Sequence, residues 1–365
     1  ISLSCLALAV TRGIQKGIES WAKLMMPALY IFGFVLIYKA LTIGSPVNPD
    51  WSAIKGLNYL WTPRWGDLSF KGSLAAAGQI FFTLSLGMGI IQNYASYLKK
   101  NDDIVTSAMT TVSLNEFAEV ILGGSIAIPI TYAFTGVEGL SQSIGLSFIA
   151  LPNIFRTMDG GRLLGSLWFM LLFFAGFTSA IAMYNYLVTI LEEGMGMAKK
   201  KASLMVFIGY IIVGLPVALE PILTKTAELA YFTELDNWVG TYLLVVMGLI
   251  EIIVAGWLMK DNPLDEINRG SYWQAPKWIY TVMIKFVTPA VIIVILIGST
   301  VTYFQEGYFK FIPTFVSKTP ELIPWVNGAR AVLAFVFIVG FIGTYKSLKA
   351  VYGEEVLQNK VLIRK

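Results

Sequence analysis

Long runs of apolar residues, separated by short polar segments, recur along the whole chain. Within each run the apolar positions are continuous and do not alternate with polar ones, which predicts membrane-spanning helices and excludes a membrane β-barrel. A helix needs about 20 such residues to cross roughly 30 Å of hydrocarbon. We interpret eight runs as full spans: Lys23–Gly44, Leu74–Leu98, Val105–Phe134, Leu163–Leu191, Leu204–Leu219, Trp238–Met259, Val282–Phe304 and Val326–Tyr345.

The composition strengthens this prediction of a polytopic α-helical membrane protein. Of the 365 residues, 56% are hydrophobic and only 14% are charged, and the mean hydropathy is +0.67. A soluble domain of this size would carry about 25% charged residues. The apolar segment Ile1–Val10 is too short to span, and we interpret it as the end of a further helix.

Two absences exclude most enzyme chemistry. The chain has no histidine and one cysteine, Cys5. Zinc sites, Ser-His-Asp triads, thiolate metal clusters and intrachain disulfides therefore have no residues to form them. A membrane-embedded hydrolase or acyltransferase is the weaker hypothesis, and we expect a protein that is not an enzyme and that binds no nucleic acid.

The placement of lysine and arginine predicts the orientation. More of them lie in the connections on the side of Thr11–Ala22 than on the other side, where the connections are also longer. Cytoplasmic loops carry an excess of positive residues. We therefore predict a multi-pass protein of the cell (plasma or inner) membrane with a cytoplasmic C-terminus.

The predicted span that contains Gly78–Tyr97, GQIFFTLSLGMGIIQNYASY, is interrupted in its middle by Ser85, Gly87 and Gly89. Irregular backbone survives in hydrocarbon only where it is buried in protein or lines a cavity. Small residues also permit close packing between helices. The other interpretation is an unwound segment whose backbone groups bind a substrate or an ion at mid-membrane.

Residues beside the interruption favour the binding interpretation. Thr83 and Ser85 supply hydroxyl groups, whereas Phe81, Phe82 and Met88 supply apolar surface. An amino acid requires this combination of polar contacts for its charged groups and apolar walls for its side chain.

A second candidate site lies in the stretch FFAGFTSA at 173–180. The carbonyl of Ala175 and the hydroxyls of Thr178 and Ser179 stand at i, i+3 and i+4 and share one helix face. Neutral oxygens in apolar surroundings are ligands for a hard cation. The alternative is hydroxyl groups that bond back to their own helix, which is frequent in membrane spans.

A third candidate site lies deep in another span, where Asn115 and Glu119 stand at i and i+4. A carboxylate within the bilayer is costly and marks an ion path or a charge partner. Asn115 offers an amide oxygen to a cation, and Glu119 offers a compensating negative charge. A hydrogen bond between packed helices is the alternative role.

Together these stretches resemble the neurotransmitter:sodium symporter family, and most closely its bacterial LeuT-like amino-acid transporters. The resemblance runs through all 365 residues. It is carried by GQIFFTLSLGMG at 78–89, YASY at 94–97, LNEFAEVILGGS at 114–125, LPNIF at 151–155, FFAGFTSAIA at 173–182 and LDNWVG at 235–240.

The resemblance implies a LeuT-type fold of twelve helices with two inverted repeats and a broken first and sixth helix. Residues 1–44 match the end of helix four and helix five, residues 71–260 match helices six to ten, and residues 278–348 match helices eleven and twelve of one transmembrane domain, 1–365. Helices one to three have no counterpart in this sequence. We expect the eight full spans to be the fifth to twelfth helices.

The resemblance also implies roles for individual residues. Thr83 and Asn115 match a first sodium site, and Ala175, Thr178 and Ser179 match a second. Glu119 stands where chloride-dependent members have serine, which implies no chloride requirement. Gln79 and Asp236 match an extracellular gate, and Tyr97 and Glu193 match a cytoplasmic one. The implied substrate pocket is Phe82, Thr83, Ser85, Met88, Ser179 and Met183.

The predicted function is sodium-coupled symport of a neutral, hydrophobic amino acid into the cell by alternating access. Met88 and Met183 support this substrate class because thioether side chains adapt to apolar partners of different shape. The expected partners are the amino acid, two sodium ions and the lipid bilayer, and the sequence leaves an oligomer open. The alternative is a partial or non-transporting binding or regulatory protein of the same fold.

Overall fold

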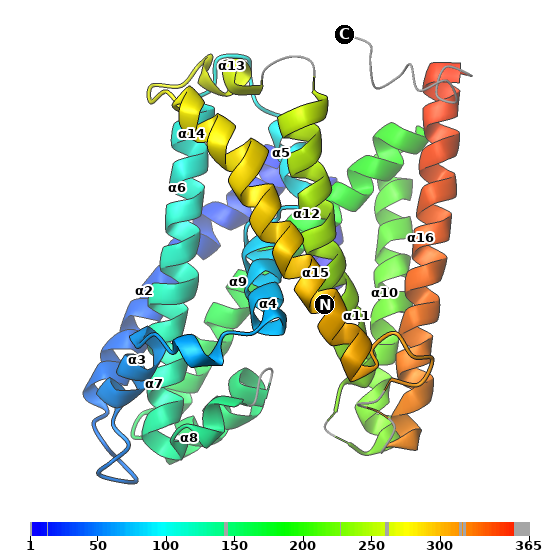
Figure 1. The fold of residues 1–365 in the computed structure, drawn as a ribbon. Helices are drawn as coiled ribbons and strands as arrows, with labels where there is room; N and C mark the ends of the chain where they lie inside the picture. The colour runs from blue at the N-terminus through cyan, green and yellow to red at the C-terminus, as the bar shows by residue number, and fades with distance from the viewer. Residues whose placement is uncertain are drawn as a thin grey trace. The chain divides into compact units, whose positions relative to one another are not determined.

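The computed structural model describes residues 2–12, 14–141, 145–226, 228–259, 263–313, 316 and 319–353. These residues form helices joined by short connections, and no strand occurs among them (Figure 1). The predicted all-α class is therefore confirmed. Ile1, Ile144, Lys260, Lys318 and the predicted cytoplasmic tail 354–365 lie outside the described residues.

Seven helices of the described chain are long and apolar enough to cross a membrane. The remaining predicted span, Leu74–Leu98, is divided into two shorter helices, α4 (Phe70–Thr83) and α5 (Ile90–Ala95). Neither is long enough to cross a membrane, so this span is not among the seven. The prediction of a multi-pass membrane protein is confirmed. The seven long helices are Gly17–Thr42, Ile104–Thr135, Gly161–Gly194, Lys199–Thr224, Ala230–Leu258, Lys277–Glu306 and Pro320–Lys349.

The described chain divides into two compact units, each with its own core. The first unit comprises Ile1–Asp67 and Met109–Met183, and the second comprises Leu68–Ala108 and Tyr184–Lys365. The long helix α9 (Gly161–Thr189) contributes to both units.

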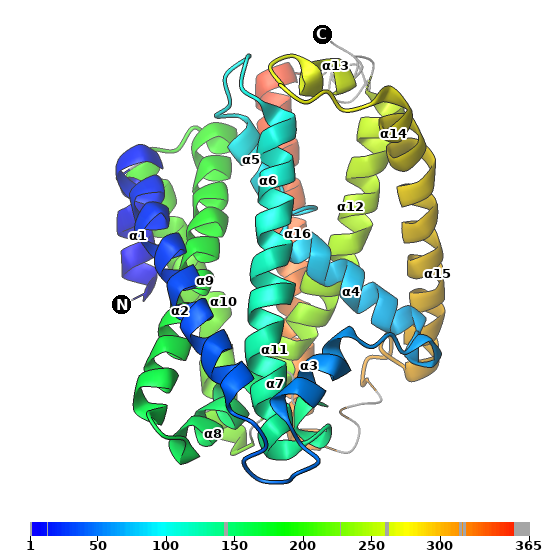
Figure 2. The same cartoon turned by 90° about the vertical axis from the view of Figure 1, so that its left-hand side faces the viewer.

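The core of the first unit forms where α7 packs against α2 and α3 (Figure 2). Leu36 of α2 and Leu122, Ile126 and Ile130 on the helix that contains α7 are fully or almost fully buried there. Besides α9, its helices are α1 (Ser2–Thr11), η1 (Ile14–Glu19), α2 (Ser20–Thr42), α3 (Ala53–Trp61), η2 (Trp65–Asp67), most of α6 (Ile104–Glu116), η3 (Phe117–Gly123), α7 (Gly124–Thr135), η4 (Glu138–Ser141), η5 (Leu146–Ala150) and α8 (Leu151–Thr157).

The sequence of the connection 136–161 predicts a helical hairpin in which Leu-Pro-Asn at 151–153 ends the apolar segment 144–150. The predicted break is wrong, because the chain is helical from 145 to 157. Pro152 stands at the start of α8, directly after the π-helical turn η5. Proline is tolerated in the first turn of a helix because its missing N–H would have no intrahelical partner there.

The core of the second unit forms where α4 and α12 meet α15 (Figure 1). Leu74, Val245 and Ile292 are buried at this junction. Its helices are α4 (Phe70–Thr83), α5 (Ile90–Ala95), η6 (Ile190–Gly194), α10 (Lys199–Thr224), α11 (Ala230–Leu235), η7 (Asp236–Leu243), α12 (Leu244–Ile253), η8 (Val254–Leu258), α13 (Pro263–Asn268), α14 (Lys277–Val282), η9 (Met283–Val287), α15 (Thr288–Glu306), η11 (Pro320–Leu322) and α16 (Ile323–Tyr352).

Two fully buried carboxylates hold the second unit together at α11. Glu220 of α10 accepts hydrogen bonds from the backbone N–H groups of Ala230 (2.7 Å) and Tyr231 (3.0 Å), which otherwise have no partner at the start of α11. Glu234 of α11 forms an ion pair with Arg330 of α16, with Nε and Oε1 2.5 Å apart. Buried charges need partners of this kind, because leaving one unpaired costs several kcal/mol, about 3–5 in measured cases.

A surface carboxylate outside the spans holds two loops of this unit together. Asp103 accepts hydrogen bonds from the N–H groups of Thr106 (2.9 Å) and Tyr272 (3.0 Å). These bonds favour the charged form and lower the pKa of Asp103 from 3.8 to about 2. Its folded pKa lies below the unfolded value, so the stabilisation is present above pH 3.8 and is lost as the pH falls through about 2.

Candidate functional site

The predicted interruption in the span 74–98 is present. Helix α4 ends at Thr83, α5 begins at Ile90, and the residues between them are not helical. Ser85, Gly87 and Gly89 have positive φ angles of 57°, 70° and 75°. Glycine adopts this left-handed conformation at little cost. The small residues singled out in the sequence therefore unwind the helix, and the unwound segment is 84–89.

Hydrogen bonds close the first part of the unwound segment onto α4 and leave its second part open. The N–H groups of Ser85 and Leu86 donate to the carbonyls of Phe82 (3.0 Å) and Phe81 (2.8 Å). The N–H groups of Met88 and Gly89 find no acceptor among the described residues. Such backbone groups are the kind that discontinuous membrane helices present to ligands.

Glu251 of α12 anchors the segment and was not identified from the sequence. Its Oε2 accepts a hydrogen bond from the N–H of Gly87 (3.1 Å), and its Oε1 accepts one from Nε2 of Gln92 in α5 (2.8 Å). One carboxylate thus holds the unwound segment and the helix that follows it. The available signal was an acidic residue inside the apolar run 238–259, which marks a functional position by default.

Close packing against α12 fixes the same segment. A Cβ atom added at Gly87 would lie 2.8 Å from the carbonyl oxygen of Leu244, and one added at Gly248 would overlap the ring of Phe81. The backbone of the unwound segment therefore approaches α12 at a distance that only glycine allows. Both interpretations of the small residues, close packing and unwinding, hold in this structure.

The predicted pocket residues of the second unit gather at this break. Phe82 and Thr83 end α4, and Ser85 and Met88 lie in the unwound segment. The side chain of Phe82 is exposed, and the other three residues are half-buried. The structure thus brings these four together on one short stretch, while Ser179 and Met183 belong to the first unit.

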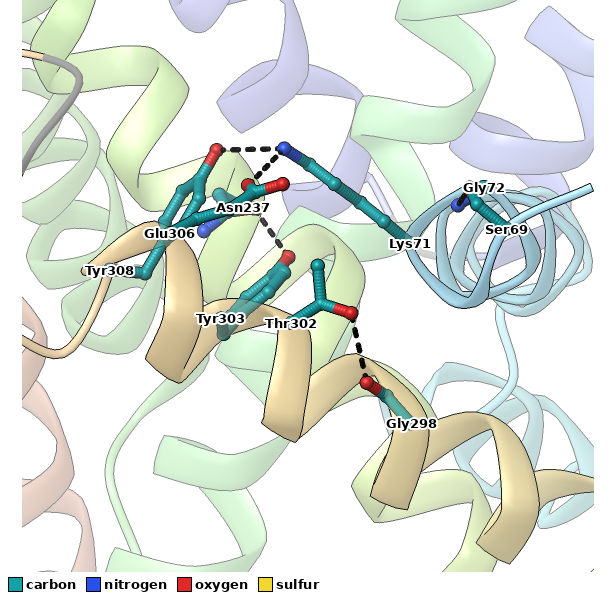
Figure 3. A network of polar contacts seen from close by, with 9 residues as sticks. All are labelled: Ser69, Lys71, Gly72, Asn237, Gly298, Thr302, Tyr303, Glu306 and Tyr308. Carbon is teal, nitrogen blue, oxygen red and sulfur yellow. Dashed lines mark hydrogen bonds and ion pairs between the residues drawn. The ribbon is translucent and has the colours of Figure 1, made fainter. Parts of the chain in front are cut away.

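A polar cluster anchors the other end of α4 (Figure 3). Ser69 accepts a hydrogen bond from the N–H of Gly72 and caps the helix. Lys71 then forms an ion pair with Glu306 at the end of α15 (2.6 Å) and donates to the hydroxyl of Tyr308 (3.3 Å). Tyr303 of α15 in turn donates to Oδ1 of Asn237 (2.7 Å). Helix α4 is therefore tied to α15 at its start and to α12 at its break.

The predicted gate residues of the second unit lie at different places. Gln79 is on α4, and Asp236 is the first residue of η7. These two helices pack closely against each other at Gly78 and Thr241. Tyr97 follows α5, and its hydroxyl lies 3.4 Å from both Oδ1 of Asn93 and Nδ2 of Asn185. Among the described residues it forms no bond to Glu193, which is exposed in η6.

The predicted second sodium set lies on α9 in the first unit. The hydroxyl of Thr178 donates to the carbonyls of Phe174 (2.9 Å) and Ala175 (3.1 Å), as the alternative interpretation anticipated. This bond directs the hydroxyl proton into the helix, so that lone pairs of the oxygen remain available. Ser179 and Ala175 stand one turn or less away on the same helix.

Asn115 and Glu119 lie on either side of a change in helix type. Asn115 is near the end of α6, and Glu119 is in the π-helical segment η3. Both residues are half-buried, and both make polar contacts. A π-helical turn contains more residues than an α-helical one and occurs frequently at functional sites. Asn115 belongs to the first unit and Thr83 to the second.

A multi-pass helical protein with a broken helix that leaves backbone N–H groups without helical partners has the architecture of a secondary transporter. Residues 1–349 match the sequence model of the Sodium:neurotransmitter symporter family. The chain belongs to this family, whose members are transporters and not enzymes. The resemblance seen in the sequence is thereby confirmed.

Individual proteins similar to this chain are also transporters. The chain is 31% identical over 332 residues to an uncharacterised sodium-dependent transporter of Methanocaldococcus jannaschii, covering 87% of this chain and 63% of the relative. It is 26% identical to sodium-dependent nutrient amino acid transporter 1 of Drosophila grimshawi, covering 83% and 46%. The crystal structure of MhsT in complex with L-phenylalanine superposes with a TM-score of 0.71 at 27% identity, covering 81% of this chain and 66% of MhsT.

The MhsT match confirms the predicted LeuT-type fold. The chain spans just under two thirds of the length of the first of these relatives.

The close approach at Gly87 generates a prediction. Gly87→Ala should lower the free energy of unfolding by about 1–3 kcal/mol, because it adds a left-handed non-glycine residue and a contact with Leu244. Thermal unfolding of the purified protein measures this. Gly209→Ala in α10 is the matched control, since its added Cβ meets no atom within 4 Å. Equal melting temperatures for the two variants would show that the segment does not need this close approach.

The anchor at Glu251 generates a second prediction. Glu251→Gln keeps the shape of the side chain but replaces one acceptor oxygen by an NH₂ group, which cannot accept a hydrogen bond. Either the N–H of Gly87 or the amide of Gln92 then loses its acceptor, so the unwound segment should lose order. We expect about tenfold weaker sodium-dependent substrate binding by scintillation proximity. Glu266→Gln, which changes only a surface pair with Arg269, should leave binding unaltered. Wild-type affinity in the Glu251 variant would remove Glu251 from this role.

Proposed function

We propose that the protein is a sodium-coupled symporter that carries an amino acid across the cell membrane by alternating access. The observation that carries the proposal is the unwound segment 84–89, with two backbone N–H groups left without an acceptor in the described chain and with Glu251 as its anchor. Membership of the Sodium:neurotransmitter symporter family supports it. An amino-acid carboxylate is the natural acceptor for backbone amides in hydrocarbon.

The proposed substrate is a neutral, hydrophobic amino acid. Phe82 and Met88 beside the break and Met183 on α9 supply apolar surface, and none of the pocket residues proposed carries a charge. The amino-acid ligand of MhsT and the nutrient amino acid transporters of Drosophila support this class. The thioether groups would accommodate side chains of more than one shape.

Two sodium ions are proposed to bind with the substrate. Thr83 and Asn115 would contribute side-chain oxygens to the first ion. The Ala175 carbonyl with the Thr178 and Ser179 hydroxyls would contribute to the second, and the orientation of the Thr178 hydroxyl leaves its oxygen available. The gradient of these ions would supply the driving force. Gln79 and Asp236 would close the outer side, and Tyr97 and Glu193 the inner side.

The proposed topology has the C-terminus in the cytoplasm and one transmembrane domain, with helix six beginning at α4. Glu119 would supply negative charge near the first sodium ion in place of chloride. Because it is attached to the protein, we propose that transport needs no chloride.

Uptake into proteoliposomes tests the function directly. With sodium outside, labelled leucine or phenylalanine should accumulate, and potassium in place of sodium should abolish accumulation. Unlabelled lysine or glutamate should compete poorly. Saturable sodium-dependent binding without uptake would instead support a non-transporting binding protein. The experiment is performed with this chain and with the chain extended by any upstream sequence of its reading frame.

The charge of Glu119 generates a prediction about chloride. Glu119→Ser should make sodium-dependent uptake require chloride, because the substitution removes the attached negative charge. Uptake in chloride and in gluconate measures the requirement. Glu116→Ser, one turn earlier on α6, is the matched control and should remain indifferent to chloride. Indifference of the Glu119 variant would show that Glu119 does not replace chloride.

A further inference from the structure

A small cavity lies apart from the broken helix, beside the ion pair between Glu234 and Arg330. It has a volume of about 260 Å³. Trp238, Tyr308 and Phe309 form aromatic walls, Leu243 and Leu333 form aliphatic ones, and Arg330 is the charged residue of the lining. Only part of an organic ligand fits such a volume, since ligand pockets usually exceed about 300 Å³.

The guanidinium of Arg330 is held rigidly and retains binding capacity. Its Nε donates to Glu234, its Nη1 to the carbonyl of Lys310 (2.6 Å) and its Nη2 to the carbonyl of Tyr308 (2.6 Å). A guanidinium has five N–H groups, so one on each terminal nitrogen is not used by these bonds. Paired N–H groups of arginine suit the oxygens of a phosphate.

The local charge also favours an anion. Glu234 neutralises Arg330 in their ion pair, and Lys71 is neutralised by Glu306. The backbone of Lys310 contacts the guanidinium, while its exposed side chain forms no ion pair among the described residues. Lys310 therefore adds a positive charge on a residue whose backbone contacts the guanidinium.

The aromatic residues around the cavity are typical of a membrane–water boundary. The rings of Trp238 and Phe309 lie 5.3 Å apart, and those of Tyr303 and Tyr308 lie 4.6 Å apart. Tyr303 lies in the last turn of α15, Tyr308 and Phe309 follow that helix, and Trp238 of η7 packs against Tyr303 and Phe309. Aromatic residues are enriched at the level of the lipid headgroups.

Apolar surface continues from the cavity along two helices. On α16, exposed Phe337 and Phe341 follow Arg330 and Leu333 at helical spacing. Along α12, exposed Met247 and Ile250 follow Leu243 in the same way. Most of the apolar stretch within the span 320–349 is not covered by other parts of the described chain. A ligand with its anionic group at Arg330 would find hydrocarbon-like surface beneath it.

We propose that this cavity binds the phosphate of an anionic phospholipid, whose acyl chains lie along α12 and α16. The chemistry of the site requires one phosphate group attached to an apolar chain. A free phosphate satisfies only the polar half of the site, and a zwitterionic lipid does not match the unpaired charge of Lys310. This lipid site is separate from the proposed symport function and does not depend on it.

Native mass spectrometry of the purified protein in a neutral detergent tests the proposal. The probes are phosphatidylglycerol and phosphatidylcholine with identical acyl chains, and inorganic phosphate as a competitor. We expect one tightly retained phosphatidylglycerol, little phosphatidylcholine and no displacement by inorganic phosphate. Equal retention of the two lipids, or displacement by phosphate alone, would overturn the proposal.

Two variants locate the site without breaking the buried ion pair. Lys310→Gln should weaken phosphatidylglycerol retention about fivefold, the contribution of one basic residue near a membrane surface. Leu333→Trp should fill the cavity and abolish the retained lipid. The matched controls are Lys225→Gln, at an exposed lysine of the same unit, and Leu204→Trp, at an exposed leucine of α10.

The controls should retain the lipid as the wild type does. Unchanged retention in both cavity variants would overturn the proposal. If the wild type is a dimer and these variants are monomers that still retain the lipid, a second copy of the chain covers this surface, and the proposal is likewise overturned.

Discussion

The structure depends on one constraint, which is that backbone polar groups within a bilayer need partners. In an unbroken helix each backbone N–H finds a carbonyl of the same helix, whereas the segment 84–89 lacks these helical hydrogen bonds. The molecule compensates with Glu251, which accepts the N–H of Gly87 and the amide of Gln92, and with turns that return the N–H groups of Ser85 and Leu86 to α4. The N–H groups of Met88 and Gly89 are among those that remain without a partner in the described chain. These are groups that a ligand can satisfy.

The same constraint explains why α4 is anchored at both ends. A helix that stops partway along a span is not held in position by a helical continuation. The ion pair of Lys71 with Glu306 and the close contact of Phe70 with Gly298 hold its start against α15. Phe81 against Gly248 holds its end against α12. The unwound segment is therefore presented by two neighbouring helices, which suits a site whose geometry must be kept within fractions of an ångström.

Two buried carboxylates elsewhere in the second unit also satisfy polar groups and join helices. Glu220 supplies acceptors to the start of α11, and Glu234 joins α11 to α16 through Arg330. Because Arg330 also binds two loop carbonyls, the loop after α15 is fixed by the same guanidinium. These three bonds leave one N–H group on each terminal nitrogen of Arg330 unused. The lipid proposal rests on these two N–H groups.

Sequence alone determined the fold class, the spans and the place of the break. Spans follow from local hydrophobicity over about 20 residues. Gly87 and Gly89 favour a left-handed backbone because glycine adopts positive φ angles at little cost, whatever packs against it. The sequence did not identify Glu251 and Arg330, whose partners are 164 and 96 residues away, and its interpretation of Pro152, which stands in the first turn of α8, was wrong. Only the tertiary structure decided these points, because the partner of a buried charge is set by packing between helices and not by the residues beside it in the chain.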